Sequence, residues 1–241
     1  MRILALDTAT ENCSVALLID GRLTARERLL PRGHAAHILP MIEELLGESC
    51  TALASLTAIA FGCGPGAFTG VRLAASVTQG LAYAAGLKVV AISDLRAVAQ
   101  RLLGLAPTAT HALVVNDARM HEVYWGCFER AAGDLAVPVG EEHVGRPEGV
   151  RLPDAWVRHG EGLEIWAAGT GLAAYPELKL RVAEGLGAGV LGGAREDLLP
   201  CAVDVARLAV PEVLSGRLLA PEEALPVYLR NDVADPPRGS H

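Results

Sequence analysis

The first thirty residues alternate between apolar runs and turn residues, a pattern typical of a β-meander. Residues 3–6 and 13–19 are apolar enough to form buried strands. Asp20-Gly21 is a common hairpin turn, and it leads into a third strand over residues 22–30. We therefore expect the chain to begin with three antiparallel strands.

Helices and strands alternate after this meander. Apolar residues recur at helical spacing between residues 33 and 47, which predicts an amphipathic helix that ends at Gly47. Pro40 is expected to kink or restart its first turns. Further along, Ser93 is a suitable N-cap for a helix. Alternation of this kind is typical of an α/β lobe. The other elements expected in this part are strands at 57–61 and 88–92 and helices at 69–85 and 94–105.

A second hairpin near the middle of the chain resembles the first in its layout. A strand is expected at 111–116, a turn at 117–120 and a returning strand at 121–128. Asp7 ends the first strand of one hairpin and Asp117 that of the other, so we expect a structural duplication although the residues do not repeat.

The pattern weakens after this hairpin. Residues 129–164 carry prolines and glycines typical of loops, and elements return as a strand at 165–168, a helix start at 172–175 and a final helix at 201–214. The expected organisation is an N-terminal lobe (1–108), a C-terminal lobe (109–231) whose last helix packs back on the first lobe, and a disordered tail (232–241).

Composition supports a large core and disfavours direct binding of nucleic acid. The 241 residues are 51% hydrophobic but only 4% aromatic, so small aliphatic side chains fill the interior and let helices approach a sheet closely. The net charge of −7 argues against a broad basic surface.

Cysteine use and the N-terminus both favour a cytoplasmic protein. The five cysteines are odd in number and form no C-x-x-C pair, which suits reduced thiols rather than a disulfide framework or a zinc site. The first apolar run is broken by Asp7 and is too short for a signal peptide, and no stretch is long enough to span a membrane. We expect a soluble protein without a membrane partner.

The segment Gly64-Pro-Gly-Ala-Phe-Thr-Gly-Val-Arg72 has two interpretations. Glycines at the start of a helix can cradle a phosphate, because the helix N-terminus offers unpaired N–H groups. However, no Lys-Ser/Thr pair follows the second glycine, and no G-x-G-x-x-G pattern fits. A tight turn that packs a helix onto a strand explains the same glycines without a ligand.

Asp7 occupies the place where sugar kinases and actin-like ATPases hold a metal-bound nucleotide phosphate. Those ATPases usually have a glycine after the aspartate, so that backbone amides can wrap the phosphates, but this chain has Ala9. The second turn, from Asp117 to Met120, contains no glycine. Both departures argue against an autonomous phosphotransfer site.

A metal-dependent or serine hydrolase has little support. His34 and His37 could share a metal with Glu43 or Glu44, but spacing alone is weak evidence and the H-E-x-x-H arrangement is absent. A solvated helix start is the better explanation of these histidines. The serines lack the G-x-S-x-G context of a nucleophile elbow.

Several motifs taken together identify a family. In order, they are MRILALDTAT at residues 1–10 with CSVAL at 13–17, His34, GPGAFTGVR at 64–72, DARMHEVYW at 117–125 and PVYLRN at 226–231. In this order and spacing the chain closely resembles the bacterial TsaB family, also called YeaZ, over nearly its full length. The resemblance implies an α/β, two-lobed actin-like ATPase (ASKHA, ribonuclease H-like) fold with a degenerate nucleotide site.

The same resemblance implies a role in forming N6-threonylcarbamoyladenosine (t6A) beside the anticodon of tRNA. TsaB is in that family a non-catalytic pseudoenzyme that binds the TsaD transferase as a heterodimer, and the ATPase TsaE joins the pair. A homodimer using an overlapping surface is implied when TsaD is absent. The resemblance implies no cofactor of the chain's own, and it places ATP or ADP at the junction with TsaD. tRNA is bound only through the complex.

The family's partner surface is the pair of N-terminal-lobe helices, here about 34–46 and 69–85. Small side chains on the second helix would allow close approach to TsaD, although the same face could instead pack on its own sheet. The implied partner-binding residues are His34, Ile38, Met41, Ile42, Leu45, Thr69, Gly70, Arg72, Ala75, Thr78, Gln79 and Ala82. The degenerate nucleotide-site positions are Asp7, Thr8, Thr10, Asp117 and Arg119. No catalytic or metal-binding residue is implied.

Two rival functions remain open. One is an autonomous ATPase or a glycoprotease-like metallopeptidase, against which the missing H-x-x-x-H motif and the glycine-poor turns argue. The other is a stand-alone tRNA-binding module, which the acidic composition disfavours.

Overall fold

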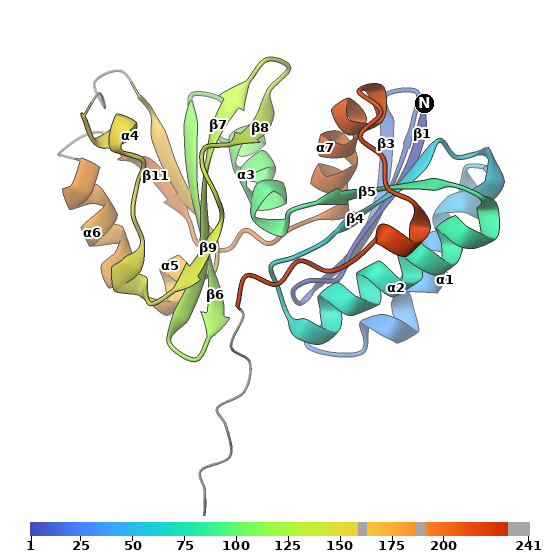
Figure 1. The fold of residues 1–241 in the computed structure, drawn as a ribbon, viewed down its shortest axis with the longest axis horizontal. Helices are drawn as coiled ribbons and strands as arrows, with labels where there is room; N and C mark the ends of the chain where they lie inside the picture. Colours follow the sequence, from blue (N-terminus) through green and yellow to red (C-terminus); the bar gives the residue numbers. More distant parts are fainter. Residues whose placement is uncertain (159–162, 187–190, 231–241) are drawn as a thin grey trace, which may run out of the picture.

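The computed structural model describes residues 1–158, 163–186 and 191–230 and contains two β-sheets (Figure 1). The N-terminal sheet has the strand order β3-β2-β1-β4-β5. Its first three strands form the expected antiparallel meander, and β4 and β5 continue from β1 in parallel. The strands are β1 (Arg2–Asp7), β2 (Asn12–Ile19), β3 (Arg22–Leu29), β4 (Ala58–Gly62) and β5 (Lys88–Ile92).

Side-chain alternation along these strands gives the N-terminal sheet two buried faces. Leu4, Leu6 and Phe61 pack beneath α1 (His34–Glu48) and α2 (Phe68–Ala85), whereas Ile3 and Ala5 face α7 (Ala202–Leu214). A strand buried on both faces needs apolar residues throughout, which explains the nearly continuous apolar run at residues 3–6.

The C-terminal sheet repeats the first in its order, β8-β7-β6-β10-β11, with β9 paired to β7. Antiparallel β6, β7 and β8 correspond to β1, β2 and β3, and parallel β10 and β11 correspond to β4 and β5. This confirms the expected duplication and the actin-like fold class. The strands are β6 (His111–Arg119), β7 (Glu122–Ala131), β8 (Leu135–Pro138), β9 (His143–Gly145), β10 (Ile165–Ala168) and β11 (Leu191–Arg195).

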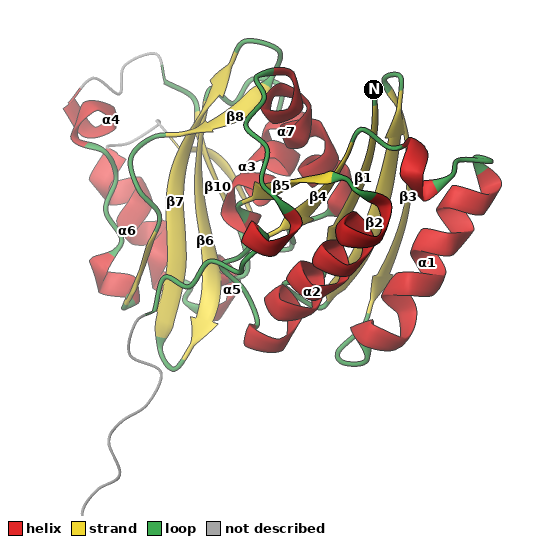
Figure 2. Ribbon diagram, turned by 45° about the vertical axis from the view of Figure 1, so that its right-hand side comes forward, coloured by secondary structure: helices red, strands yellow, loops and turns green. Residues whose placement is uncertain are grey.

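Two helices lie between the sheets and join them through one core (Figures 1 and 2). α3 (Asp94–Leu105) packs on β6, β7 and β8 and also contacts α7, which covers the N-terminal sheet. The far face of the second sheet carries the short helices α4 (Asp154–Arg158), α5 (Gly171–Ala174) and α6 (Glu177–Leu186). No helix in the described ranges has the length and apolar character needed to cross a membrane.

The last described residues, 217–230, form a segment without strands that contains one 3-10 turn, Pro221–Glu223, and that we call the C-terminal strap (Figure 1). Leu219 pairs with Val89 at the edge of β5, and the Ala224 carbonyl accepts a hydrogen bond from Gln79 of α2. The Val227 N–H donates to the Cys63 carbonyl at 2.7 Å. Arg230 then ion-pairs with Glu122 in the second lobe, so the strap connects both lobes.

The sequence misplaced one helix end and one turn. Gly47 lies inside α1. The helix ends at Glu48 with Ser49 as its C-cap, and Cys50 adopts the left-handed conformation (φ 49°) that glycine usually supplies. The helix also runs through Pro40 without restarting. The second turn is centred after Arg119 rather than at 117–120, because a register shift between Asp117 and Arg119 extends β6.

Residues 129–164, where the hydrophobic pattern is weak, contain β8, β9 and α4, which the sequence did not predict. It did not predict α6 or β11 either. These elements are short, so they carry little periodicity. The Ser93 N-cap is confirmed, because its Oγ accepts a hydrogen bond from the Arg96 N–H at 3.2 Å. The tail expected to be disordered lies outside the described residues.

Candidate functional site

A cleft of about 430 Å³ opens between the lobes, where the carboxyl ends of β1 and β6 face each other. Ligands of open α/β sheets bind at this edge. Its walls come from the turn after β1, the loop into α2, the end of β6, the residue that precedes α5, β7 and the strap. The lining residues are Ala9, Thr10, Glu11, Pro65, Gly66, Ala67, Phe68, Asn116, Asp117, Ala118, Arg119, Tyr124, Thr170, Val227, Tyr228, Leu229 and Arg230.

The turns after β1 and in β6 share one local geometry. Asp7 Oδ1 accepts the Ala9 N–H at 2.9 Å, and Asp117 Oδ1 accepts the Arg119 N–H at 2.9 Å. In each turn an aspartate side chain satisfies the backbone two residues later, which stabilises the bend without a glycine. The two lobes therefore share this aspartate-stabilised turn. The hydrogen bonds to the aspartates occupy the Ala9 and Arg119 N–H groups, which could otherwise bind an anion.

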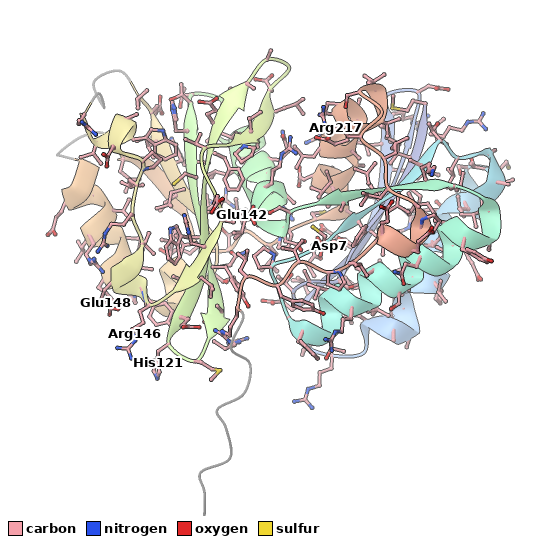
Figure 3. All side chains as sticks on the ribbon, viewed as in Figure 1. Asp7, His121, Glu142, Arg146, Glu148 and Arg217 are labelled. Atoms are coloured by element: carbon pink, nitrogen blue, oxygen red, sulfur yellow. The ribbon has the colours of Figure 1, made fainter. Side chains whose placement is uncertain are left out.

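Asp7 does not reach the cleft. Its side chain is 0% exposed and lies in the interior between the sheets (Figure 3). Asp94, at the first position of α3, is also 0% exposed and faces Asp7. Burial raises the pKa of both carboxyls, and that of Asp94 is raised well above its usual range by burial and by the charge of Asp7.

Thr8 is withdrawn from the cleft as well. It is buried, and its Oγ1 donates a hydrogen bond to the Gly70 carbonyl at 2.7 Å. Of the five expected nucleotide-site positions, only Thr10, Asp117 and Arg119 line the cleft. Asp7 and Thr8 hold the turn to its neighbours, and their role as degenerate nucleotide-site positions stays a prediction.

The glycines at 64–72 are explained by backbone contacts within the chain. A Cβ on Gly66 would lie 2.6 Å from the Ala9 carbonyl oxygen, and one on Gly70 would overlap the Thr8 carbonyl. The Ala67 N–H donates to the Ala9 carbonyl at 2.7 Å. These contacts favour the tight-turn interpretation of the loop over a phosphate cradle.

The three arginines near the cleft all have partners within the chain. Arg72 lies over the Phe68 ring, 3.4 Å from its centroid, and its Nε donates to the Tyr228 hydroxyl at 2.7 Å. Arg119 pairs with Asp117 at 2.9 Å. Arg230 pairs with Glu122 and donates to the Ala118 carbonyl at 3.2 Å.

Most of the expected partner-binding residues are buried in the monomer. Ile38, Met41, Ile42 and Leu45 of α1 and Ala75, Thr78 and Ala82 of α2 form the face that packs on the N-terminal sheet. Gly70 approaches Thr8, and Gln79 bonds to the strap. The small-residue face of α2 therefore packs on its own sheet, and the assignment of the seven buried residues to a partner surface is corrected. Gly70 and Gln79 are half-buried, and their role in partner binding stays a prediction.

The opposite faces of α1 and α2 are exposed. Thr69 and Arg72 lie on this side, and His34 is partly exposed. Leu39 of α1 is 45% exposed and Tyr83 of α2 is 82% exposed. We call this surface the outer face; it comprises Ala35, Ala36, Leu39, Pro40, Glu43, Glu44, Thr69, Arg72, Ser76, Gly80, Tyr83 and Ala84.

His34 and His37 have separate partners. His34 Nε2 donates to the Thr10 carbonyl at 2.8 Å, whereas His37 Nδ1 faces the Arg28 guanidinium at 3.5 Å. Across residues 1–158, 163–186 and 191–230, no three His, Cys, Asp or Glu side chains gather closely enough to hold a metal ion.

Sequence reasoning missed Asp94, Glu142 and Tyr228. Asp94 follows a helix N-cap, where an acidic residue is common, so nothing local indicated a buried partner. Glu142 lies in the loop between β8 and β9 and accepts a hydrogen bond from Ser93, next to Asp94 (Figure 3). Burial raises the pKa of Glu142. Only the tertiary fold brings these groups together.

Comparison with known proteins gives consistent matches. The family model described as TsaD, tRNA N6-adenosine threonylcarbamoyltransferase, matches residues 28–183. The tRNA threonylcarbamoyladenosine biosynthesis protein TsaB of Escherichia coli is 41% identical over 97% of this chain and 96% of its own length. The Haemophilus influenzae protein of the same description is 38% identical over 97% and 95%.

Two solved structures from Pseudomonas aeruginosa are also similar. The first, described as YeaZ, is 41% identical, has a TM-score of 0.82 and covers 95% of this chain and 99% of its own. The second, described as an uncharacterized protein with similarity to peptidase YeaZ, has a TM-score of 0.83 with the same identity and coverage.

Proposed function

The chain belongs to the TsaB (YeaZ) family of tRNA threonylcarbamoyladenosine biosynthesis proteins, and from this premise we propose that it is a non-catalytic subunit that activates the TsaD transferase. In this proposal it binds TsaD as a heterodimer in the cytoplasm, and the ATPase TsaE joins the pair. tRNA contacts the complex rather than this chain alone, in keeping with the net charge of −7.

The observation that carries the non-catalytic role is the burial of Asp7. A carboxylate that assists phosphate transfer must reach the bound nucleotide, since its effect depends on contact with the reacting groups. Asp7 is 0% exposed and bound to the Ala9 N–H. The Asp7 carboxyl therefore stabilises the fold, and the turn above it contributes little to an anion site.

The outer face of α1 and α2 is the surface we propose for TsaD. It combines exposed aromatic and aliphatic groups, Tyr83 and Leu39, with small residues such as Ser76 and Gly80 that allow close approach. The TsaD family model matches residues 28–183, which contain both helices, so the partner has a related fold. Two related helix pairs can meet about a pseudo-two-fold axis, and a homodimer would use the same face.

Any ATP or ADP is proposed at the junction with TsaD rather than as a cofactor of this chain alone. The side chains of Asp7 and Thr8 do not line the cleft, and the Ala9 and Arg119 N–H groups already donate hydrogen bonds to aspartates. The cleft therefore offers few free donors from its two turns for a triphosphate.

An omission assay tests the proposal. The chain, TsaD and TsaE are mixed with tRNA, ATP and threonylcarbamoyl-adenylate, and t6A is measured with each protein left out in turn. We expect t6A formation to require this chain together with TsaD, and the chain alone to release no phosphate from ATP and to cleave no peptide. ATP hydrolysis or peptide cleavage by the isolated chain that Asp7→Asn abolishes would contradict the non-catalytic role.

A further inference from the structure

Asp7 and Asp94 meet in the interior of the protein. Their unbonded oxygens, Asp7 Oδ2 and Asp94 Oδ1, both lie beside Gly62, where a Cβ on that residue would overlap each of them. Neither of these oxygens has a hydrogen-bond donor among the described residues. Only glycine at position 62 leaves room for two carboxyl groups to face each other.

The other oxygen of each carboxyl is bound to backbone. Asp7 Oδ1 accepts the Ala9 N–H in the turn after β1. Asp94 Oδ2 accepts the Gly64 N–H, and the Asp94 N–H donates to the Gly64 carbonyl at 2.9 Å. The two aspartates therefore connect the turn after β1, the loop that leads into α2 and the first turn of α3.

The groups around the pair offer little compensating charge. Cys13 of β2 and Cys63 after β4 are buried thiols whose pKa values burial raises, so both are neutral. Glu142 approaches from the second lobe and adds negative charge, while His34 of α1 is the basic group facing Asp7. Two ionised carboxylates in contact, without a cation between them, would repel strongly in such a site.

We propose that Asp7 and Asp94 share one proton, which Asp94 donates to Asp7, and that this shared proton holds the loop at residues 62–72 in place. The protonated carboxyl supplies the donor that both orphaned oxygens lack. Loss of the proton leaves two charges facing each other beneath the loop that carries α2, so the loop and the start of α2 loosen as pH rises.

The shared proton makes the unfolding equilibrium depend on pH, and the direction of that dependence follows from the pKa of Asp94. An aspartate in the unfolded chain releases its proton near pH 4. The raised pKa of Asp94 means that the folded protein keeps this proton to a higher pH, so within that window each increase in pH favours unfolding. One retained proton changes the unfolding equilibrium constant by about tenfold per pH unit.

The experiment compares the wild type with Asp94→Asn, Asp94→Ala and Asp204→Asn, each as the full chain. Asparagine copies the protonated acid, since its oxygen can accept the Gly64 N–H and its amide can donate to Asp7. Asp204 is a matched control, because it is a buried aspartate outside the pair, on α7, and burial raises its pKa to about 6.

Three measurements are made: the infrared band of a protonated carboxyl at pH 7.5, unfolding in urea between pH 5 and pH 8, and hydrogen exchange of residues 62–72. We expect Asp94→Asn to lose part of the infrared band, to flatten the pH dependence by about one proton and to keep wild-type exchange. Asp94→Ala should accelerate exchange at least tenfold, and Asp204→Asn should keep the infrared band.

Two results would overturn the proposal. One is an infrared band and a pH slope in Asp94→Asn that match the wild type, which would mean that no proton is shared. The other is equally fast exchange in Asp94→Asn and Asp94→Ala, which would mean that the polar contact does not hold the loop. None of the three measurements involves TsaD, so their outcome is independent of the proposed function.

Discussion

Gly70 and Gly80 lie on the same helix, but only Gly70 has a structural reason to be glycine. Gly70 sits where the first turn of α2 touches the Thr8 carbonyl, whereas a Cβ on Gly80 meets nothing within 4 Å. Glycine inside a helix destabilises it relative to alanine, because glycine loses more backbone freedom when the chain folds. The two positions therefore separate the effect of close approach from the effect of helix propensity.

We expect Gly70→Ala to lower the free energy of unfolding by about 1–3 kcal/mol, because the new methyl group must displace the turn after β1. Gly80→Ala should raise it by up to about 1 kcal/mol. Urea denaturation of both variants checks this. Equal changes in the free energy of unfolding in the two variants would show that the close contact at Gly70 does not affect stability.

At the residue scale, the sequence predicted features that depend on near neighbours. The Ser93 cap lies three residues from the N–H that it binds, and the aspartate turns span two residues. The Asp7–Asp94 pair and the contact of Arg72 with Tyr228 depend on the folded chain, since their partners are far apart in sequence. No local pattern encodes such contacts.

At the element scale, α2 has two faces with different roles, and the sequence predicted the helix but not what each face contacts. Both faces contain small residues, so periodicity could not distinguish the one that packs on the sheet. The structure assigns Ala75, Thr78 and Ala82 to the inner face and Tyr83 to the outer face. Adjacent positions 82 and 83 therefore allow a direct comparison.

We expect Ala82→Glu to lower the free energy of unfolding by more than about 2 kcal/mol, because it buries a carboxylate in the core beneath α2. Tyr83→Glu should leave the unfolding free energy within about 0.5 kcal/mol of the wild type, as is usual at the surface. Thermal and urea unfolding of the two variants provide the measurement. A stable Ala82→Glu protein would contradict the assignment of faces.

At the scale of the whole molecule, the duplicated sheets are held by α3, α7 and the C-terminal strap. The sequence indicated the duplication from the two hairpins. The motif at 226–231 marked the family, but the strap lacks periodicity, so its path across both lobes could not be predicted. Its contacts with Cys63, Gln79 and Glu122 connect the cleft, α2 and the second lobe. This arrangement leaves the outer face of α1 and α2 free to bind another protein.

The central claim is that this outer face binds TsaD, and the affinity of Tyr83→Glu for TsaD tests it most directly. Leu214→Glu is the control, because Leu214 is also an exposed apolar residue (73% exposed) but lies at the end of α7. Sedimentation velocity titrations should show at least about a tenfold weaker complex for Tyr83→Glu, about 1.4 kcal/mol. Leu214→Glu should bind like the wild type. Wild-type affinity of a folded Tyr83→Glu protein for TsaD would contradict the claim.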